Sequence, residues 1–384
     1  MKKVTILGAT GSIGTQGLKV IDAYREDFSL FGVTANKNID ALVNISIKYS
    51  PIYACIADES LYLELKDRLK GTNVMPMSGS EGINELASAK ENDIILSGLV
   101  GSVGLSPLLA ALKAAKIIAL ANKEPLVIAG DIIVKEEKLH GAKIIPVDSE
   151  PSAVYQILNG ENKNRVKKII LTASGGPLKD LSIKELEKVT PSQALNHPTW
   201  KMGKKITIDS ATLVNKGFEV IEAHYLFDTM YKDIEIIIHP ESTIHSMVEF
   251  ADGVIMAQLG APTMTTPIQY ALLEGKRGIT NFNNFDIKKL TKLTFEEPDF
   301  EKFPSLSLTI NAGKEGKNRP VVLNAANTFA VNSFLAKKIK FTDIPKIIEY
   351  ALENVENVAC NSIDEIEYFD KLTTKILTNK RKEL

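Results

Sequence analysis

Two carboxylates stand at the end of a predicted strand, in the stretch "KIIPVDSEPSAV" at residues 143–154. The apolar run is typical of a buried strand, and Asp148 and Glu150 follow it on either side of Ser149. Loops at strand ends often carry function. With no histidine or cysteine nearby, the two acids favour a hard cation, Mg²⁺ or Mn²⁺, over zinc. The pair alone leaves a second possibility open, that both acids cap the segment after Pro151.

A third acidic ligand is predicted in the stretch "DSATLVNKGFEVIEA". Its pattern indicates a helix that begins after a cap at Asp209 or Ser210. Asn215 and Lys216 lie four and three residues before Glu219, so the three side chains share one helix face. A face that mixes an amide, a cation and a carboxylate suits a site better than a core. We therefore expect Glu219 to complete the cation site.

Small polar groups in two other segments point to a ligand. Ser174 ends the predicted strand "KKIILTAS", and the glycine pair after it lets a ligand approach the backbone. The segment 196–205, "NHPTWKMGKK", holds His197 and the only tryptophan, Trp200. A loop that exposes a tryptophan is a candidate lid, which would close over a substrate and exclude water.

A glycine-rich turn follows the first predicted strand. The sequence "GATGSIG" at residues 8–14 runs from that strand into a helical pattern. Such a turn lets the backbone approach a pyrophosphate, which then sits on amides at a helix N-terminus. The spacing is G-x-x-G-x-x-G instead of the usual G-x-G-x-x-G, so an ordinary tight turn between strand and helix stays possible.

The end of the second predicted strand discriminates between two dinucleotides. NAD sites usually place an acid there to hold the ribose 2′-hydroxyl. Here "LFGVTA" is followed by Asn36, Lys37 and Asn38, with no carboxylate before Asp40. A cation at this point favours the 2′-phosphate of NADP(H), although a solvated loop lysine would give the same sequence.

The elements that must position these residues alternate between strands and helices in the first 150 residues. Six apolar runs are strand candidates: "VTILGA", "LFGVTA", "IYACIAD", "DIILSG", "KIIALAN" and "KIIPVD". Amphipathic stretches separate them, such as the one in which Leu61, Leu65 and Leu69 recur on one face. This alternation predicts an α/β domain over 1–150, a Rossmann-like doubly wound parallel sheet that binds the dinucleotide.

Strands and helices do not alternate regularly in the remaining chain. Strands "KKIILTASGG" and "IEIIIHPE" and a hairpin that turns at 251–253 predict an α+β catalytic domain over 151–281, with the metal and substrate residues and the lid. Residues 282–304 have little periodicity and are predicted as a connection. Helical patterns then predict a small helical C-terminal domain over 305–384.

Composition excludes several kinds of partner. Lys+Arg 46 against Asp+Glu 47 gives a formal net charge of -1, which argues against a nucleic-acid partner. No apolar run approaches the roughly 20 residues that span a bilayer, so no membrane partner is expected. A strand pattern that begins at Val4 leaves no room for a targeting peptide. Two distant cysteines, Cys55 and Cys360, fit a reducing compartment, and a cytoplasmic location is expected.

Six segments carry a resemblance to a known family: "GATGSIG", "LANKEPLV", "PVDSEPSA", "TASGGP", "NHPTWKMGKKITIDSATLVNKGFEVIEA" and "HPESTIHSMVEF". In this order they resemble the 1-deoxy-D-xylulose 5-phosphate (DXP) reductoisomerases, which are NADPH- and metal-dependent enzymes of the methylerythritol phosphate route to isoprenoids. The block from Asn196 to Ala223 is the most specific. The resemblance implies rearrangement and reduction of DXP, a small sugar phosphate, to 2-C-methyl-D-erythritol 4-phosphate, and a homodimer built on the middle-domain sheet.

The resemblance also implies roles for individual positions. It makes Asp148, Glu150 and Glu219 the metal ligands, in agreement with the carboxylate pattern. Substrate positions are Lys123, Ser149, Glu150, Ser174, His197, Ser210, Asn215, Lys216 and Glu219. Of these, Ser174, Ser210, Asn215 and Lys216 would hold the phosphate. The residues expected to be catalytic are Asp148, Glu150, Glu219, Lys123, His197 and Trp200. Cofactor positions are Thr10, Gly11, Ser12, Ile13, Asn36, Lys37, Asn38, Asn122, Glu124 and Gly203. Asn36 departs from the family, which often has glycine there.

Two other functions compete with this assignment. Another NADP-dependent oxidoreductase, such as a semialdehyde or homoserine dehydrogenase, would also join a nucleotide domain to an α+β domain. It gives no reason for three carboxylates to cooperate around a cation. A non-catalytic NADP-sensing protein would bind the cofactor without turnover. Loss of NADPH absorbance on addition of DXP, with and without Mg²⁺, distinguishes the three.

Overall fold

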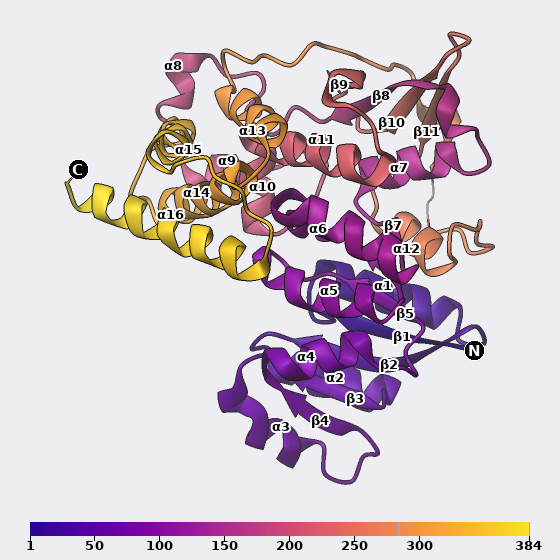
Figure 1. Cartoon of the computed structure of the whole chain (residues 1–384). Coiled ribbons are helices and arrows are strands. Elements are labelled where there is room, and N and C mark those ends of the chain that lie inside the picture. Colours follow the sequence, from indigo (N-terminus) through magenta and orange to yellow (C-terminus); the bar gives the residue numbers. More distant parts are fainter. Residues whose placement is uncertain (283–284, 384) are drawn as a thin grey trace. The chain divides into compact units, whose positions relative to one another are not determined.

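The computed structural model describes residues 1–282 and 285–383, and its elements are labelled in Figure 1. Contacts group the chain into two compact units, each assembled from several stretches. The first unit contains Met1–Pro125, Ile133–Asn159 and Thr263–Asn284, and the second contains Leu126–Ile132, Gly160–Pro262 and Phe285–Leu384.

The first unit is built on a seven-stranded sheet of order β4-β3-β2-β1-β5-β6-β7. Every neighbouring pair is parallel. The strands are β1 (Lys2–Leu7), β2 (Phe28–Ala35), β3 (Tyr53–Ile56), β4 (Met75–Ser78), β5 (Ile94–Ser97), β6 (Ile117–Leu120) and β7 (Lys143–Pro146). The predicted doubly wound sheet and its six predicted strands are confirmed.

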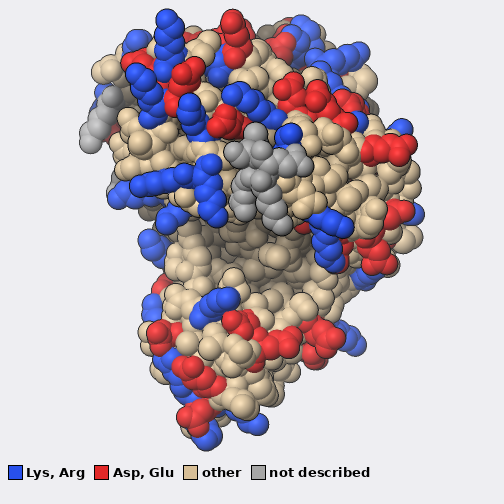
Figure 2. All heavy atoms as spheres, turned by 90° about the vertical axis from the view of Figure 1, so that its left-hand side faces the viewer, with Lys and Arg blue, Asp and Glu red and all other residues tan. Residues whose placement is uncertain are grey.

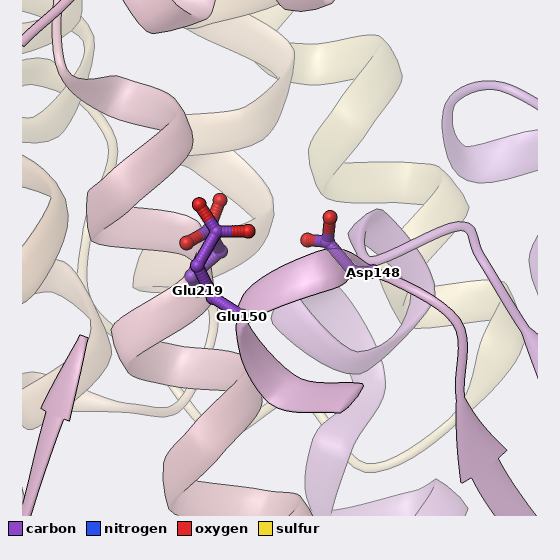
Figure 3. A group of neighbouring side chains, drawn as sticks. All are labelled: Asp148, Glu150 and Glu219. Carbon is purple, nitrogen blue, oxygen red and sulfur yellow. The ribbon is translucent and has the colours of Figure 1, made fainter. Parts of the chain in front are cut away.

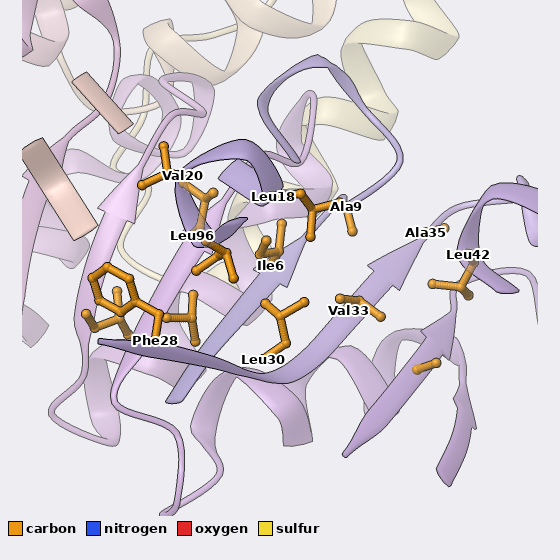
Figure 4. Packing of buried hydrophobic residues seen from close by; sticks show 14 of the residues in the cluster. Ile6, Ala9, Leu18, Val20, Phe28, Leu30, Val33, Ala35, Leu42 and Leu96 are labelled. Atoms are coloured by element: carbon orange, nitrogen blue, oxygen red, sulfur yellow. The ribbon is translucent and has the colours of Figure 1, made fainter. Parts of the chain in front are cut away.

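Helices connect these strands, as parallel pairing requires. The connecting helices are α1 (Ser12–Ala23), α2 (Ile39–Tyr49), α3 (Tyr62–Arg68), α4 (Gly79–Ser88), α5 (Leu105–Lys113) and α6 (Glu124–His140). Two further helices, α7 (Ser149–Leu158) and α12 (Thr265–Leu272), come after the last strand of this sheet. Figure 4 shows Ile6, Val33 and Leu96, from three neighbouring strands, in one apolar cluster with Val20 of α1. All four are fully buried, and burial of each such side chain contributes about 1.5–3 kcal/mol to the free energy of folding. This core fixes the strand ends from which the site residues project.

One strand of the sheet was not predicted from the sequence. Strand β4, "MPMS", lies at the sheet edge and pairs only with β3 among the described residues. A buried parallel strand is expected to show an apolar run without proline. Strand β4 contains a proline and its side chains are only partly buried, so this pattern is missing.

The second unit contains a four-stranded sheet of order β11-β10-β8-β9. Its strands are β8 (Val166–Ala173), β9 (Ile234–Ile238), β10 (Ile244–Phe250) and β11 (Ile255–Leu259). Strands β10 and β11 are antiparallel neighbours, which confirms the predicted hairpin. Strand β8 pairs in parallel with β9, so the sheet is mixed.

Helices make up most of the remaining second unit. They are α8 (Ile183–Leu186), α9 (Pro191–Ala194), α10 (Lys204–Ala211), α11 (Val214–Phe227), α13 (Pro304–Glu315), α14 (Arg319–Leu335), α15 (Asp343–Asn354) and α16 (Ile363–Glu383). The last four confirm the predicted helical C-terminal region. Residues 283 and 284, in the predicted connection, and residue 384 lie outside the described residues. The division at 150, 281 and 304 stays a proposal, which limited proteolysis would test.

The surface carries charges of both signs. On the face shown in Figure 2, lysine and arginine side chains alternate with aspartate and glutamate. Within residues 1–282 and 285–383, no helix has the length and apolar character that crossing a membrane demands.

Candidate active site

Three carboxylates that are distant in sequence form one group. Asp148 and Glu150 lie at the start of α7, directly after β7, and Glu219 lies within α11. One oxygen from each lies within 4.8 Å of the others, and Figure 3 shows the three side chains together. Three oxygen donors of this kind suit a hard divalent cation. The structure therefore brings together the three residues that the sequence analysis selected.

The negative charge of this group has cationic partners. The Lys123 ammonium pairs with Oδ2 of Asp148, and the Lys216 ammonium pairs with Oε2 of Glu219. Both lysines are buried. Asn215 Nδ2 also donates to Glu219 Oε1 over 2.6 Å. Because buried carboxylates are stable only when their charge is compensated, these contacts balance the charge of Asp148 and Glu219 and orient both side chains.

Asp148 and Glu150 can act both as helix-capping residues and as cation ligands, the two roles that the sequence left open. Asp148 is the N-cap of α7, and its Oδ1 accepts a hydrogen bond from Ser149 N over 3.1 Å. Glu150 lies in the first helical turn, and its Oε2 accepts from Ser149 Oγ over 2.6 Å. Capping occupies only some of these oxygens' lone pairs. The cap therefore positions the acids and leaves them acceptor capacity for a cation.

The predicted start of the helix that carries Glu219 was wrong. Asp209 and Ser210 belong to the end of a separate helix, α10, and do not cap α11. Leu213, with φ of 61°, separates the two helices, and α11 begins at the next residue. A left-handed leucine has no sequence signature, so the break was invisible. The shared face of Asn215, Lys216 and Glu219 is confirmed by their contacts.

Ser174 and His197 form a hydrogen-bonded pair. Ser174 Oγ lies 3.0 Å from His197 Nε2 and accepts from Gly176 N over 3.1 Å. His197 Nδ1 accepts from the backbone N–H groups of Thr199 and Trp200, at 3.2 and 3.0 Å. Since Nδ1 accepts, the neutral ring carries its proton on Nε2 and donates it to Ser174. The Ser174 hydroxyl hydrogen is then directed elsewhere, as a phosphate ligand requires.

Trp200 differs from its predicted exposure. It is half-buried, with its ring centroid 6.1 Å from that of His245 at an interplanar angle of 59°. The preceding loop is held by the two N–H groups that bind His197. The tryptophan was expected to be exposed because the segment is polar and contains proline and glycine, whereas its contact with β10 is a long-range one.

The glycine-rich turn has the form that a pyrophosphate needs. Gly8 has φ of +83°, and Gly11 is the N-cap of α1 without a side chain to cap the first turn. A Cβ at Gly14 would lie 2.4 Å from both Ala9 Cα and Gly8 O. Only glycine permits this close approach of helix and strand, which leaves the N-terminus of α1 facing the end of β1. Ser12 is exposed at that N-terminus, while Thr10 and Ile13 are half-buried.

Comparisons with known proteins cover nearly the whole chain. The family model for 1-deoxy-D-xylulose 5-phosphate reductoisomerase matches residues 4–130, and models for its C-terminal domains match 144–227 and 259–376. The enzyme of this name from Clostridium perfringens strain 13 is 47% identical over 382 residues, which cover 99% of this chain and 100% of the relative. The chain belongs to the 1-deoxy-D-xylulose 5-phosphate reductoisomerase family.

Solved structures of DXP reductoisomerases agree with this assignment. The Zymomonas mobilis enzyme in complex with NADPH is 41% identical, with 100% of both chains covered and a TM-score of 0.94. A DOX-P reductoisomerase in complex with NADPH, fosmidomycin and magnesium is 38% identical. The match covers 100% of this chain and 98% of the solved chain, also with a TM-score of 0.94.

The positions that only the DXP reductoisomerase resemblance had suggested lie in distinct settings. Asn122 and Glu124 are buried before and at the start of α6, where Asn122 Nδ2 donates to Glu124 Oε2 over 2.6 Å. Gly203 is the N-cap of α10, and a Cβ there would meet nothing within 4 Å. The pairing of Lys123 with Asp148 was missed, because no periodic pattern links residues in different loops.

Of the three residues after β2, Asn38 caps the next helix, whereas Asn36 and Lys37 are exposed. Asn38 caps α2 by accepting from Ala41 N over 3.1 Å. Lys37 is largely exposed, with its ammonium 3.7 Å from Asp58 Oδ2. An exposed pair of this length contributes little to stability, so Lys37 can turn to another anion at small cost. Asn36 is exposed beside it.

Proposed function

We propose that Asp148, Glu150 and Glu219 hold the divalent metal with which this family member rearranges and reduces DXP to 2-C-methyl-D-erythritol 4-phosphate. The observation that carries this proposal is the convergence of three carboxylate oxygens within 4.8 Å of one another. A bound Mg²⁺ or Mn²⁺ would act as a Lewis acid toward the substrate's carbonyl and hydroxyl oxygens. Oxygen ligands accept either ion, so we propose both as possible metals.

The cofactor site is proposed at the glycine-rich turn and the loops beside it. NADPH, which the solved relatives bind, supplies the hydride for the reduction. Thr10, Gly11, Ser12 and Ile13 would place the pyrophosphate on the amides at the start of α1, and Lys37 would pair with the 2′-phosphate. Further contacts are proposed for Asn36, Asn38, Asn122, Glu124 and Gly203.

The substrate phosphate is proposed to bind in the second unit. Ser174, Ser210 and Asn215 would donate hydrogen bonds to it, and Lys216 would supply the positive charge. The Ser174 hydroxyl is prepared for this role, because His197 and Gly176 occupy its acceptor positions. Fixing the phosphate holds the reacting carbons in one geometry. Trp200 would close over the bound substrate, while Ser149 and Lys123 would contact its reacting end.

Lys216→Ala should raise the KM for DXP about 100-fold, since it removes a buried cation that a dianionic phosphate would use. Steady-state kinetics at saturating NADPH and Mg²⁺ measures this. Lys232→Ala removes an exposed lysine of the same unit and serves as the control. An unchanged KM in Lys216→Ala would exclude Lys216 from the phosphate site.

Binding of the substrate phosphate should weaken in acid, because the proposed contact of Ser174 with the phosphate requires a neutral His197. Burial lowers the pKa of His197 from its ordinary 6.5, so the neutral ring persists in the folded protein at pH 7. Protonation would place a hydrogen on Nδ1, where two N–H groups now donate. The arrangement is therefore complete above pH 6.5 and is lost as the pH falls through the lower folded pKa. The KM for DXP should rise in that range, whereas His197→Asn should show no such acid limb in KM.

Family membership decides between this activity and the two competing functions. The direct test is the decrease in NADPH absorbance on addition of DXP. Turnover that requires both DXP and Mg²⁺ is expected. NADPH oxidation with homoserine or a semialdehyde, and none with DXP, would refute the assignment.

We propose a homodimer that forms along strand β11. This strand is an edge of its sheet, and it exposes Ile255, Met256 and Leu259 by 54%, 40% and 36%. Edge strands with apolar side chains tend to pair with another copy. Ile255→Lys should shift the protein from dimer to monomer in sedimentation velocity, and Ile183→Lys, at another exposed isoleucine, should not. A monomeric parent protein would contradict the proposal.

A cytoplasmic location remains a proposal. It is supported by two free thiols, Cys55 buried and Cys360 half-buried, which fit a reducing compartment. Fractionation of cells with an antibody against the chain would test it, and recovery outside the cytoplasmic fraction would contradict it.

A further inference from the structure

Helix α10 connects two of the positions assigned above. Gly203 is its N-cap, and Ser210 lies in its last turn. The helix has eight residues, so its placement decides where the Ser210 hydroxyl points. The residue before Ser210 is Asp209, which is only 2% exposed. A buried carboxylate in so short a helix must be held by defined partners.

Two side chains supply those partners. Lys205, one turn earlier, places its ammonium 2.7 Å from Asp209 Oδ2. Asn327, in helix α14 of the C-terminal helical region, donates from Nδ2 to Asp209 Oδ1 over 2.8 Å. Asn327 is fully buried. Because a carboxylate only accepts, the orientation of the Asn327 amide is fixed by this bond. Helix α14 thus holds α10 through one specific polar contact.

The C-terminal end of α10 rests on the turn that carries Ser174. A Cβ at Gly176 would lie 2.7 Å from Ser210 O and 3.1 Å from Ala211 Cα, so the backbone of α10 packs directly on this glycine. The N–H of Gly176 donates to Ser174 Oγ. Ser174 and Ser210 therefore share one small contact region. The position of Ser210 relative to Ser174 depends on how firmly α10 is pressed onto this turn.

We infer that Asn327 is a positioning residue for the substrate phosphate, and that it acts through Asp209. The bond to Asp209 holds α10 against the Gly176 turn, so that the Ser210 and Ser174 hydroxyls reach the same phosphate. Asn327 does not touch the substrate. The inference rests on the proposed function, because it takes Ser210 as a phosphate ligand. Sites of this kind require placement to within about 0.5 Å, which a single buried polar contact can decide.

Asn327→Leu is the first test, because it removes the donor and keeps the side-chain volume. We expect the KM for DXP to rise about tenfold, with the KM for NADPH unchanged and kcat changed by less than about threefold. Asn324→Leu is the matched control. Asn324 is also buried in α14, and its Oδ1 accepts no hydrogen bond among the described residues. An equal rise in the control, or a fall in kcat alone, would overturn the inference.

Ser210→Ala separates this inference from the phosphate assignment. If Asn327 acts through Ser210, the double variant should have the KM of Ser210→Ala alone. Additive effects would show that Asn327 acts elsewhere and would overturn the inference while the phosphate site stands. A rise in KM for Ser210→Ala but not for Asn327→Leu would do the same. No change in Ser210→Ala would remove Ser210 from the phosphate site, and the inference would fall with it.

A polarity swap covers the case in which Asn327→Leu does not fold. Asn327→Asp alone places two carboxylates face to face and should raise the KM for DXP. Adding Asp209→Asn restores one amide–carboxylate bond in the reverse direction and should recover at least half of the loss on a logarithmic scale. Failure of the swap to recover the KM, with the parent thermal midpoint regained, would overturn the inference.

Discussion

Glu219→Gln is expected to lower kcat/KM for DXP by a factor on the order of 10²–10³. Glu219 is fully buried and contributes one of the three oxygens of the carboxylate group. Glutamine keeps the size of the side chain, but it offers one acceptor oxygen to the two donors Asn215 and Lys216 and removes one negative charge. The proposed metal site then loses the electrostatic attraction on which hard-cation binding depends. Because the buried Lys216 ammonium then loses its counter-ion, the free energy of unfolding should also fall, by about 3 kcal/mol.

Two measurements check this prediction. Initial rates over a range of Mg²⁺ concentrations should show both a lower maximum and a higher half-saturating concentration. NADPH binding, followed by its fluorescence, should equal that of the parent protein. Glu235→Gln, at an exposed glutamate that pairs with Lys168, is the control. Full metal-dependent turnover in Glu219→Gln would remove this residue from the metal site.

Gly14→Ala is expected to damage both the fold and cofactor binding. The added Cβ would lie 2.4 Å from two backbone atoms, Ala9 Cα and Gly8 O, which cannot rotate away as a side chain can. Either α1 or the turn must shift. We expect the free energy of unfolding to fall by about 3 kcal/mol and the Kd for NADPH to rise more than tenfold.

Chemical denaturation and NADPH titration measure the two effects. Gly11→Ala is the control for stability, because Gly11 has φ of −83° and the nearest atom to its Cβ would be 3.3 Å away. It should lose far less stability than Gly14→Ala. If Gly14→Ala bound NADPH as tightly as the parent protein, the turn would not be the pyrophosphate site.

The fold was predictable where a single local pattern determines an element. Apolar runs located six of seven parallel strands, and the turn at 8–14 located the first crossover. Strand β4 escaped because its side chains are only partly buried and its proline lowers strand propensity. The break between α10 and α11 escaped because the surrounding structure imposes a left-handed conformation on Leu213. Tertiary contacts, not local preference, decide both features.

The site was predictable in its residue types but not in its partnerships. Asp148 and Glu150 stood out because two acids end an apolar strand, and Glu219 because it shares a polar face with Lys216. The contacts of Lys123 with Asp148 and of Asn327 with Asp209 join residues far apart in sequence. Hydrophobic periodicity, with a period of two residues in strands and 3.6 in helices, identifies one element at a time. It therefore cannot predict a contact between two elements.

The proline of strand β4 has a consequence for the behaviour of the protein at high concentration. Met75 N donates to Ile52 O, so it faces the neighbouring strand, and the nitrogen of Pro76 must face the open side of the sheet. Proline has no hydrogen there to offer to an incoming chain. A strand from another molecule that paired with this edge would lack one hydrogen bond, so aggregation through β4 is disfavoured.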